Sequence, residues 1–422
     1  MRETDFIEAV ENAGGTLYIV GGWVRDMLRG EKPQDKDFVV AGMERETFLR
    51  LFPAAVCTGK SFPVYLLEID GVKAEVAFAR REKKTGRGYT GFSVDFAASV
   101  TIEEDLLRRD TTMNSMALRL PEKTLIDPYG GQADIERRTI RATSKHFLED
   151  PVRALRAARQ AAELDFSVAD DTVPLMAACG SELMSEPADR LVHELSRALA
   201  APRPSLFFQV LLQADLLQLV FPELFAMCGK MQPAAYHPEG DAFAHAMQVV
   251  DETARRTRNL PARFAALAHD LGKGTTPAEM LPHHYGHEGR GLEALAAWNK
   301  RMTLPRAWLQ AARFVIKEHM RAPLLAKKGK MVELLLAVEL SGLSFADFCS
   351  IILVDHGALP RYLAEGEEIL ALLRGIRGGD APPGMEGPAV GRWLHEQRVR
   401  ALGRYLAQGT AEREVQQDSA EE

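Results

Sequence analysis

The sequence predicts an α+β protein in which a mixed-sheet head is followed by an all-helical remainder. Between residue 16 and about residue 80, short runs rich in β-branched and aromatic residues alternate with turn residues. From about residue 147 onward, apolar residues recur at spacings of three and four, as on amphipathic helices. A chain of 422 residues is too long for one compact core, so two to four domains are expected.

The elements of the head and of the helical part follow from these patterns. Strands are expected at 17–20 (LYIV), 37–40 (DFVV), 64–69 (VYLLEI) and 74–79 (AEVAFA), with a helix that begins at Val24. Helices are expected within 149–164, 187–200 and 205–224. The glycine- or proline-rich stretches 84–91 and 378–388 are expected to be exposed loops or linkers.

Composition and charge restrict the class of protein. The net charge of −7 gives no general attraction for nucleic acid, so such a partner would need a local basic face. No run of about 18 apolar residues occurs and the first residues are acidic, so a cytoplasmic protein without a membrane partner is expected. The four cysteines show no CxxC spacing and are expected to be buried apolar residues: Cys57, Cys179, Cys228 and Cys349.

Two glycines follow the first expected strand. Gly21 and Gly22 lead from that strand into a helix, where free backbone N–H groups and the helix dipole can hold a phosphate. Arg25, on the first turn, can reach the same phosphates. Taken alone, the segment equally fits a tight turn with a surface Arg-Asp pair.

A pair of aspartates follows in the segment DKDF. If residues 35–40 form a strand, Asp35 and Asp37 share one face, about 6.5 to 7 Å apart along the chain. Two such carboxylates can bind the Mg²⁺ ions that phosphoryl transfer requires. Glu75 is either a third carboxylate of this group or a charged residue on the solvated face of an edge strand. Together with the glycine turn, the aspartates predict nucleotidyl transfer.

Five segments in this order resemble the motifs of the class II tRNA nucleotidyltransferases, or CCA-adding enzymes, whose relatives include bacterial poly(A) polymerases. They are GGWVRD (21–26), DKDF (35–38), RRDTTMNSMA (108–117), IDPYGGQADIERRTIR (126–141) and EDPVRALRAAR (149–159). The resemblance covers about the first 225 residues. It implies a nucleotidyltransferase-fold head that adds CCA to tRNA 3′ ends without a template, from CTP and ATP. Asp35 and Asp37 would be the catalytic residues that bind Mg²⁺, and the glycine turn with Arg25 would hold the triphosphate.

The segment that begins at Arg108 combines cations with a carboxylate. Arg108 and Arg109 suit phosphates, and Asp110 can accept hydrogen bonds from ribose hydroxyls, which would favour NTP over dNTP. Asn114 would face the same side if a helix begins here. Without the resemblance, an exposed charge cluster at a helix end is the alternative.

The segment EDPVR predicts how the base is chosen. Asp150 and Arg153 lie three apart, so on a helix a carboxylate and a guanidinium would lie side by side and imitate a base-pairing edge for C or A. Arg190 and Glu194 resemble a further family motif and are spaced to pair at i, i+4. The resemblance assigns Arg156 and Arg190 to the nucleotide pocket as well.

Three further features bear on specificity and packing. Residues 80–92 correspond to the flexible segment that the family uses to switch from C to A addition, and their full length favours CCA over CC addition. Ser115 stands where relatives often have Ala, which should matter little. Gln160 stands where an aromatic residue usually follows, so packing of the neck is expected to differ there, with no catalytic role affected.

The C-terminal half carries imidazoles and carboxylates on successive expected helices. These ligand types suit divalent transition metals that activate water, and their order resembles the HD phosphohydrolase superfamily. The predicted ligands are His245, His269, Asp270, His287, His319 and Asp355. Lys273 either contacts a phosphate or is solvated. The resemblance to CCA-adding enzymes with an HD domain implies 2′,3′-cyclic phosphodiesterase, 2′-nucleotidase and phosphatase activity with Ni²⁺, Mn²⁺ or Co²⁺.

The expected division is a head at 1–140, a neck and body at 141–225, an HD domain at 226–375 and a helical tail at 376–422. The expected partners are the tRNA acceptor end, CTP and ATP, with the protein a monomer or homodimer. Basic residues of the tail either follow a phosphate backbone or form the solvated side of a helix: Arg392, Arg398, Arg400 and Arg404. Two alternatives stay open: an A-adding enzyme or poly(A) polymerase, and an HD nucleotide-signalling hydrolase whose head senses a ligand.

Overall fold

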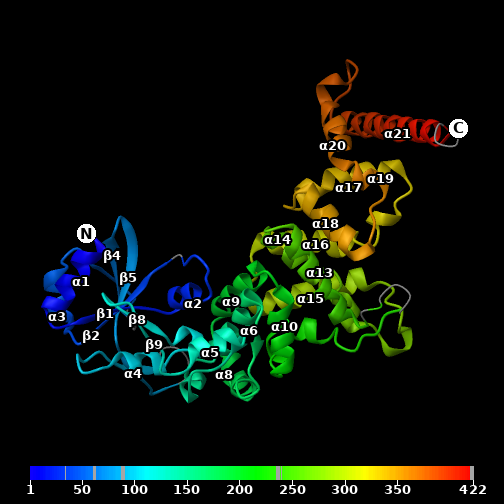
Figure 1. Ribbon diagram of the computed structural model, residues 1–422. Coiled ribbons are helices and arrows are strands. Elements are labelled where there is room, and N and C mark those ends of the chain that lie inside the picture. Colours follow the sequence, from blue (N-terminus) through cyan, green and yellow to red (C-terminus); the bar gives the residue numbers. More distant parts are fainter. Residues whose placement is uncertain (34, 60–62, 87–90, 234–237, 239, 419–422) are drawn as a thin grey trace. The chain divides into compact units, whose positions relative to one another are not determined.

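The chain forms two compact units, Met1–Val220 and Phe221–Glu422, and each is described by itself. The computed structural model describes residues 1–33, 35–59, 63–86, 91–233, 238 and 240–418 (Figure 1). The first unit contains the mixed sheet and a group of helices, and the described part of the second is helical apart from one isolated bridge, Met231 with Asp241. The predicted order of an α+β head and a helical remainder is confirmed.

A seven-stranded sheet organises the head (Figure 1). Its strands in spatial order are β3 (Val56–Thr58), β4 (Val64–Ile69), β5 (Val72–Phe78), β2 (Asp37–Ala41), β1 (Thr16–Val20), β8 (Ala117–Arg119) and β9 (Thr124–Ile126). Within this sheet β2 and β5 pair in parallel, and the other neighbouring strands are antiparallel. All four predicted strands are present. The prediction missed β3, β8 and β9 and the hairpin of β6 (Arg81–Lys84) and β7 (Phe92–Asp95), because runs this short or this charged carry little apolar alternation.

The two faces of the sheet differ in composition. Helices α1 (Glu3–Asn12) and α3 (Arg45–Leu51) cover one face with an aromatic cluster, in which Phe6 meets Phe38 at 5.7 Å between ring centroids. On the other face, α4 (Ile102–Leu107) packs on Val20 and Val39. Because side chains alternate along a strand, Asp37 shares this second face with Val39.

The turn between β4 and β5 sets the register of β5. It consists of Asp70 and Gly71, with φ of 51° and 76°, which is the left-handed pair that a two-residue hairpin turn requires. The turn pairs β5 with β4, so that Ile69 lies opposite Val72. On its other side β5 pairs with β2, where Val40 lies opposite Phe78 and Asp37 lies opposite Glu75.

Helices complete the first unit. The main ones are α2 (Gly22–Leu28), α5 (Gly131–Glu136), α6 (Val152–Leu164), α9 (Ala188–Ala200) and α10 (Pro204–Gln213). α6 packs against α9 and α10, and almost all of its side chains are buried. Its fully buried alanines, which include Ala154, Ala158 and Ala161, allow this close approach. A two-residue parallel pair, β10 (Thr139–Ile140) with β11 (Ser167–Val168), is a small departure from the prediction that strands end before residue 147.

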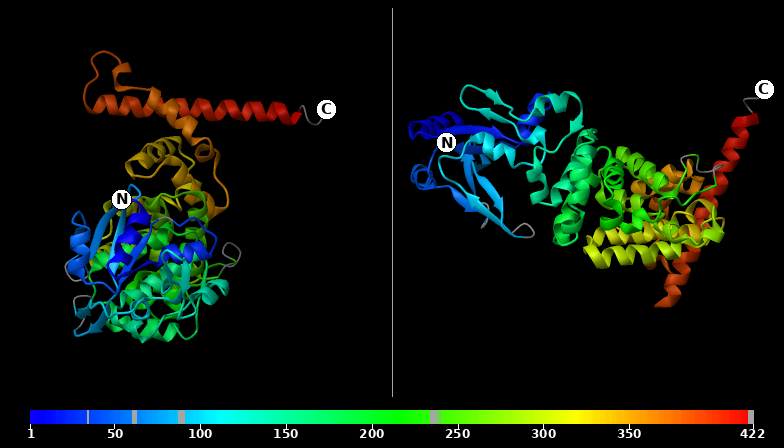
Figure 2. Two further views of the ribbon diagram at one scale, coloured as in Figure 1. Left: turned by 60° about the vertical axis from the view of Figure 1, so that its left-hand side comes forward. Right: turned by 90° about the horizontal axis from the view of Figure 1, so that it is seen from below.

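The second unit is a stack of helices. These are α12 (Pro222–Phe225), α13 (Ala242–Arg256), α14 (Leu260–Ala268), α15 (His287–Met302), α16 (Arg306–Glu318), α17 (Lys328–Leu340), α18 (Phe345–His356), α19 (Arg361–Ala364), α20 (Gly366–Gly375) and α21 (Pro388–Asp418). Phe264 lies between Trp298 and Trp308 in the core, with ring centroids at 5.4 and 5.0 Å. The long helix α21 contacts α17 and α20 (Figure 2). There Arg398 donates to the carbonyls of Leu373 and Ile376.

The cysteines and the length of the apolar helices bear on two predictions made for the whole chain. All four cysteines are free thiols, but the expectation of burial is wrong for Cys57, which is exposed on an edge strand, whereas Cys179 and Cys349 are buried and Cys228 is partly buried. Among the described residues, no single helix is long and apolar enough to cross a membrane. The helices α17 and α18 meet the requirements of length and composition only when they are taken together, and the chain bends by 116° between them.

Candidate active sites

The sheet register brings the carboxylates of the head together. Val20 pairs with Asp37, and Asp37 pairs with Glu75, so these residues form a row across three strands. The condition that residues 35–40 form one strand is not met, because β2 begins at Asp37. Asp35 nevertheless lines the same cavity of about 1160 Å³ as Asp37 and Glu75.

Asp37 has the electrostatics of a cation site. Burial raises the pKa of its carboxyl group, and the neighbouring Glu75 and Asp35 add to this effect while Arg109 opposes it. A divalent cation would relieve this repulsion between like charges, so the residue types fit Mg²⁺. Within the described part of the chain, these oxygens do not converge as tightly as the ligand atoms of the second unit described below.

The glycine turn lies directly beside Asp37. Gly21 has φ of +72°, and a Cβ atom there would lie 3.4 Å from Nη1 of Arg109 and 3.9 Å from Oδ2 of Asp37. Glycine therefore serves both the left-handed backbone and the close approach of two site residues. Arg25 lines the cavity and donates to Asp26 at 2.9 Å and to Asn114 at 3.0 Å.

Asp105 orients the two arginines of the segment RRD, and the sequence prediction missed it. Its fully buried carboxylate accepts from Arg108 at 2.6 Å and from Arg109 at 3.0 Å. Burial opposes ionisation of Asp105, but the two guanidinium groups outweigh burial and lower its pKa to about 2. The sequence did contain a signal for these ion pairs, because Arg108 and Arg109 follow Asp105 by three and four residues at the end of α4.

Asp110 is buried within a complete set of donors. Its Oδ1 accepts from the Thr111 backbone N–H at 2.8 Å and from Asn114 at 3.1 Å. Its Oδ2 accepts from Arg156 at 2.8 Å and from Gln160 at 3.2 Å. Burial opposes the charge, yet these donors hold the pKa of Asp110 well below its usual range. Asn114 faces Asp110 as expected, although it ends a short 3-10 helix, η1 (Thr112–Asn114), rather than opening an α-helix.

The structure corrects the predicted partner of Asp150. This residue precedes α6 in an extended conformation, with φ of −118° and ψ of 106°, so it is not beside Arg153 on one helix. Arg190 donates to both of its oxygens, at 3.1 and 2.8 Å, while Arg153 donates to the carbonyl of His146. Asp150, Arg153 and Arg190 all line the cavity.

The predicted pairing of Arg190 with Glu194 is also wrong. Arg190 pairs with Asp150 and Glu186, whereas Glu194 accepts from Arg159 of α6 at 2.6 Å. The side chains of Arg159 and Glu194 are 4% and 5% exposed, so this ion pair joins α6 to α9 inside the core. Its role is to hold the two helices that carry the cavity residues.

Replacement of Glu194 by methionine is expected to destabilise the packing of α6 on α9 by about 3 kcal/mol, because the buried charge of Arg159 loses one of its partners. Native-state hydrogen exchange of the α6 amides measures this loss in the first unit alone. Glu182→Met is the matched control, since Glu182 forms a partly exposed pair with Lys84 at 2.6 Å and should change exchange by about 1 kcal/mol or less. Equal effects of the two substitutions would contradict the assignment.

The loop expected to be flexible connects β6 and β7. Thr85 donates its N–H to the carbonyl of Gly91 at 2.8 Å, which closes the loop at its base. Residues 87–90 of the predicted segment 80–92 lie outside the described residues.

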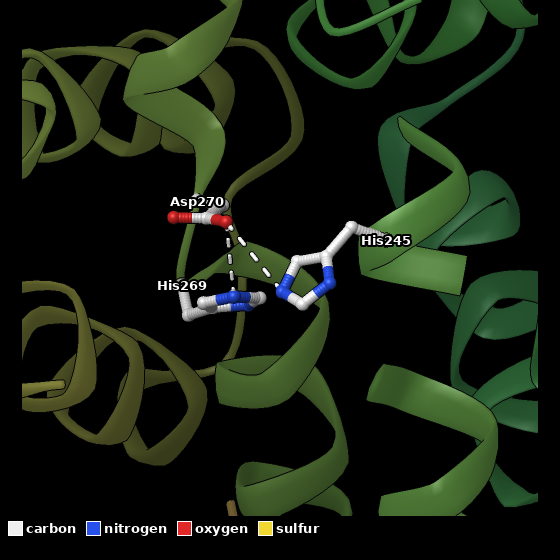
Figure 3. Close-up of side chains that lie close together, drawn as sticks. All are labelled: His245, His269 and Asp270. Carbon is white, nitrogen blue, oxygen red and sulfur yellow. Dashed lines mark ion pairs between the residues drawn. The ribbon is translucent and has the colours of Figure 1, made fainter. Parts of the chain in front are cut away.

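A second cluster lies in the second unit, where five helices or helix ends converge. His245 comes from α13, His269 and Asp270 follow α14, and His287 begins α15. Figure 3 shows His245 and His269 directed at the Asp270 carboxylate, at 3.8 and 3.2 Å from its Oδ2. His319, which follows α16, and Asp355 of α18 complete the set, so all six predicted ligands are brought together.

Asp270 belongs to two groups of close ligand atoms. One group is His245, His269 and Asp270, and the other is Asp270, His287 and His319; within each, the atoms lie within 4.8 Å of one another. Burial disfavours the charge of Asp270, but His269 and Lys273 outweigh it and lower its pKa. Oδ1 of Asp270 and Nε2 of His269 are buried and lack a hydrogen-bond partner among the described residues, which fits atoms that ligate a cation.

In three of these histidines, the Nδ1 atom lies within hydrogen-bonding distance of a backbone carbonyl. Nδ1 contacts the carbonyl of Ala266 at 2.7 Å in His269, of His284 at 2.9 Å in His287, and of Val315 at 3.1 Å in His319. A carbonyl only accepts, so Nδ1 carries a proton, and Nε2 is the nitrogen that can offer a lone pair to a metal once it is deprotonated. This arrangement is the one that metal-binding imidazoles use.

Neighbouring residues support this cluster. Lys273 donates to Gln232 at 2.6 Å and pairs with Asp270 at 2.5 Å, so it is buried rather than solvated. His284 contacts Thr276 and Met231, and His356 contacts the carbonyl of His319 at 3.0 Å. The prediction missed the supporting roles of His284, Gln232 and His356, for which only proximity in the sequence was a signal. His237 lies outside the described residues.

Comparisons with known proteins agree with both clusters. Three family models match: the poly A polymerase head domain at residues 17–141, the probable RNA and SrmB-binding site of polymerase A at 165–228, and the HD domain at 242–357. The multifunctional CCA protein of Mannheimia succiniciproducens is 44% identical over 312 residues, 72% of this chain and 73% of that protein. That of Paraburkholderia phytofirmans is 39% identical over 420 residues, 92% of this chain and 98% of that protein.

Solved structures share the fold. The Bacillus stearothermophilus CCA-adding enzyme in complex with CTP has a TM-score of 0.64 at 24% identity, covering 96% of this chain and 92% of that one. The Thermotoga maritima CCA-adding enzyme complexed with tRNA has a TM-score of 0.60 at 21% identity, with coverage of 93% and 88%. The predicted nucleotidyltransferase head with helical body and HD domain is thereby confirmed.

The fold and the two clusters define a nucleotidyltransferase of the poly(A) polymerase and CCA-adding class with an appended HD domain. The chain belongs to the multifunctional CCA protein family and is a CCA-adding enzyme. The resemblance stated from the motifs is correct.

Proposed function

We propose that this enzyme adds C, C and A in turn to tRNA 3′ ends from CTP and ATP. The observation that carries the proposal is the row of Asp37 and Glu75 beside the Gly21 turn, with Asp35 on the same cavity. Asp35 and Asp37, with Glu75 as a third carboxylate, would hold Mg²⁺. When bound, Mg²⁺ would supply charge stabilisation for attack of the RNA 3′-hydroxyl on the α-phosphate and for the departing pyrophosphate.

Residues of the same cavity are proposed to bind and select the nucleotide. Arg25 and Arg109, beside the glycine turn, would bind the triphosphate. Asp110 would accept from the ribose hydroxyls at Oδ2 in place of Arg156, its exposed donor, while Asn114 continues to hold Oδ1. This role favours ribonucleotides over deoxynucleotides.

Base selection is proposed to involve Asp150 and Arg153. The carboxylate of Asp150 would accept from the exocyclic amino group of C or A, and Arg153 would meet the neighbouring ring nitrogen, a pattern that U and G lack. Each carboxylate oxygen has two lone pairs, so Asp150 can accept from Arg190 and from a base at once. Arg190 would thereby orient Asp150.

Extension of three tRNA transcripts tests the proposal. Transcripts that end at the discriminator base, at C and at CC are offered CTP and ATP separately and together, and all three are expected to reach CCA. A transcript with a 3′-terminal deoxynucleotide lacking its 3′-hydroxyl is the control and should not extend. Extension of the CC-ended transcript alone would contradict full CCA addition and indicate an A-adding specialist.

The HD cluster is proposed to hydrolyse phosphate esters with a transition metal such as Ni²⁺, Mn²⁺ or Co²⁺. The two ligand groups that share Asp270 support this proposal, with His245, His269 and Asp355 on one side and His287 and His319 on the other. The bound metal would activate water for attack on phosphorus. 2′,3′-Cyclic phosphates, 2′-nucleotides and phosphomonoesters at RNA ends are the proposed substrates.

The four-part division is proposed as well: head 1–140, neck and body 141–225, HD domain 226–375 and tail 376–422. The matches to the head, RNA-binding and HD models support it. The tRNA acceptor end is the proposed macromolecular partner, and the enzyme is proposed to act in the cytoplasm as a monomer or homodimer.

A further inference from the structure

Gln160 is a buried polar residue at a position of α6 where an apolar side chain would simply pack. Its side chain is 1% exposed, and a buried amide is costly unless its polar atoms are satisfied. Both ends of the amide have partners. Nε2 donates to Oδ2 of Asp110 at 3.2 Å, and Oε1 accepts from the Thr111 hydroxyl at 2.8 Å.

The chemistry of these partners fixes how the amide points. The ionised Asp110 carboxylate can only accept, so the NH₂ group of Gln160 must face it. The carbonyl oxygen then faces Thr111, whose hydroxyl donates to it. A flipped amide would place an oxygen against the carboxylate, so the Thr111 hydrogen bond locks the donor toward Asp110.

Gln160 and Arg156 hold the same oxygen of Asp110 in different surroundings. The Arg156 side chain is 41% exposed and lines the cavity, whereas Gln160 is enclosed. With two donors on each oxygen, the carboxylate cannot rotate without breaking bonds. If Arg156 moves when a nucleotide enters, Gln160 is the donor that keeps this oxygen in place.

We propose that Gln160 is a positioning residue for ribose selection, which acts by fixing the carboxylate of Asp110 from the core side. The inference rests on the proposed function, in which Asp110 accepts from the ribose hydroxyls. It assigns to Gln160 a role in specificity, contrary to the expectation that this residue alters only packing. Since Gln160 lies on α6 with Arg153 and Arg156, it also links the ribose contact to the helix proposed to read the base.

The test compares ATP with dATP as substrates for a CC-ended tRNA. Gln160→Met keeps the length of the side chain and removes both hydrogen bonds, and the ratio of kcat/KM for ATP over dATP is expected to fall about tenfold. The loss should appear mainly in KM for ATP. Thr111→Val, which frees the amide from its other partner, should lower the ratio in the same direction, and it serves if Gln160→Met does not fold.

Thr112→Val is the matched control. Thr112 is buried and donates to Asp134 at 2.8 Å, with no contact to Asp110, so its loss should lower the melting temperature and leave the ATP to dATP ratio unchanged. The Asp110→Asn variant tests the ribose contact of Asp110 separately from the positioning role of Gln160. If Asp110→Asn leaves the ratio unchanged, the proposed ribose contact is wrong. If Asp110→Asn abolishes discrimination while Gln160→Met and Thr111→Val do not change it, Gln160 only packs and the inference is overturned.

Discussion

Replacement of Asp35 and Asp37 together by alanine is expected to lower the rate of nucleotide addition by at least about 10³-fold, or about 4 kcal/mol of activation free energy. The reason is that both carboxylates line the cavity beside Gly21 and are the proposed Mg²⁺ ligands there. Single-turnover extension of a CC-ended tRNA with ATP measures the rate. Phosphatase activity on a model phosphomonoester should be unchanged, because its proposed ligands belong to the second unit.

Glu44→Ala with Glu46→Ala is the matched control. These two carboxylates are exposed at the start of α3, on the opposite face of the sheet, so the same loss of charge should leave extension unchanged. Unchanged extension in the Asp35 and Asp37 double variant would overturn the metal assignment in the head.

Replacement of His269 by alanine or of Asp270 by asparagine is expected to abolish the phosphohydrolase activity, by about 10³-fold or more, and to leave CCA addition intact. Asp270 belongs to both ligand groups, so its loss should also remove bound metal, which elemental analysis of the purified protein measures without any activity assay. Addition of Ni²⁺, Mn²⁺ or Co²⁺ to chelated wild-type enzyme should restore hydrolysis.

His283→Ala is the control for these variants, because His283 is exposed and stacks on Tyr285 at 5.5 Å between ring centroids, away from the ligand set. Full metal content and hydrolysis in Asp270→Asn would show that the cluster is not the metal site. A parallel loss of CCA addition would show that the two sites are not independent.

Local pattern was sufficient for the strands that build the catalytic face. A short apolar run placed Asp37 correctly at the head of β2, since four apolar residues follow it without interruption. The further condition that Asp35 belongs to the same strand is not met, because the polar segment before Asp37 carries no pattern that marks where pairing begins. Glu75 was left between two interpretations, and only its pairing with Asp37 decides that it faces the cavity.

Spacing along a helix was a poor guide to ion pairs. Asp150 precedes Pro151, and a residue before proline is disfavoured in the helical conformation; Asp150 is extended and the predicted i, i+3 pair with Arg153 is not formed. The i, i+4 pair of Arg190 and Glu194 failed for a different reason. Tertiary packing offered Arg190 the carboxylate of Asp150 from 40 residues away, and single-sequence spacing contains no information about such contacts.

The HD ligands were predictable as a set because their chemistry is unusual at every position. Imidazoles and carboxylates on otherwise apolar helices require a partner, whereas the residues that support them look ordinary. Gln160 is such a supporting residue in the head. Its departure from an aromatic residue was visible in the sequence, but its hydrogen bonds to Asp110 and Thr111 depend on the packing of α6 against the head.

The two-residue turn at Asp70 and Gly71 leads into β5, in which alternate residues face the hydrophobic core and the catalytic cavity. The register that buries Phe78 in the aromatic core is the same register that directs Glu75 to the other face, beside Asp37. A shift by one residue would exchange the two faces, so the strand could not lose its catalytic orientation while keeping its core. Substitutions that keep the buried face of β5 therefore also keep position 75 directed at the cavity.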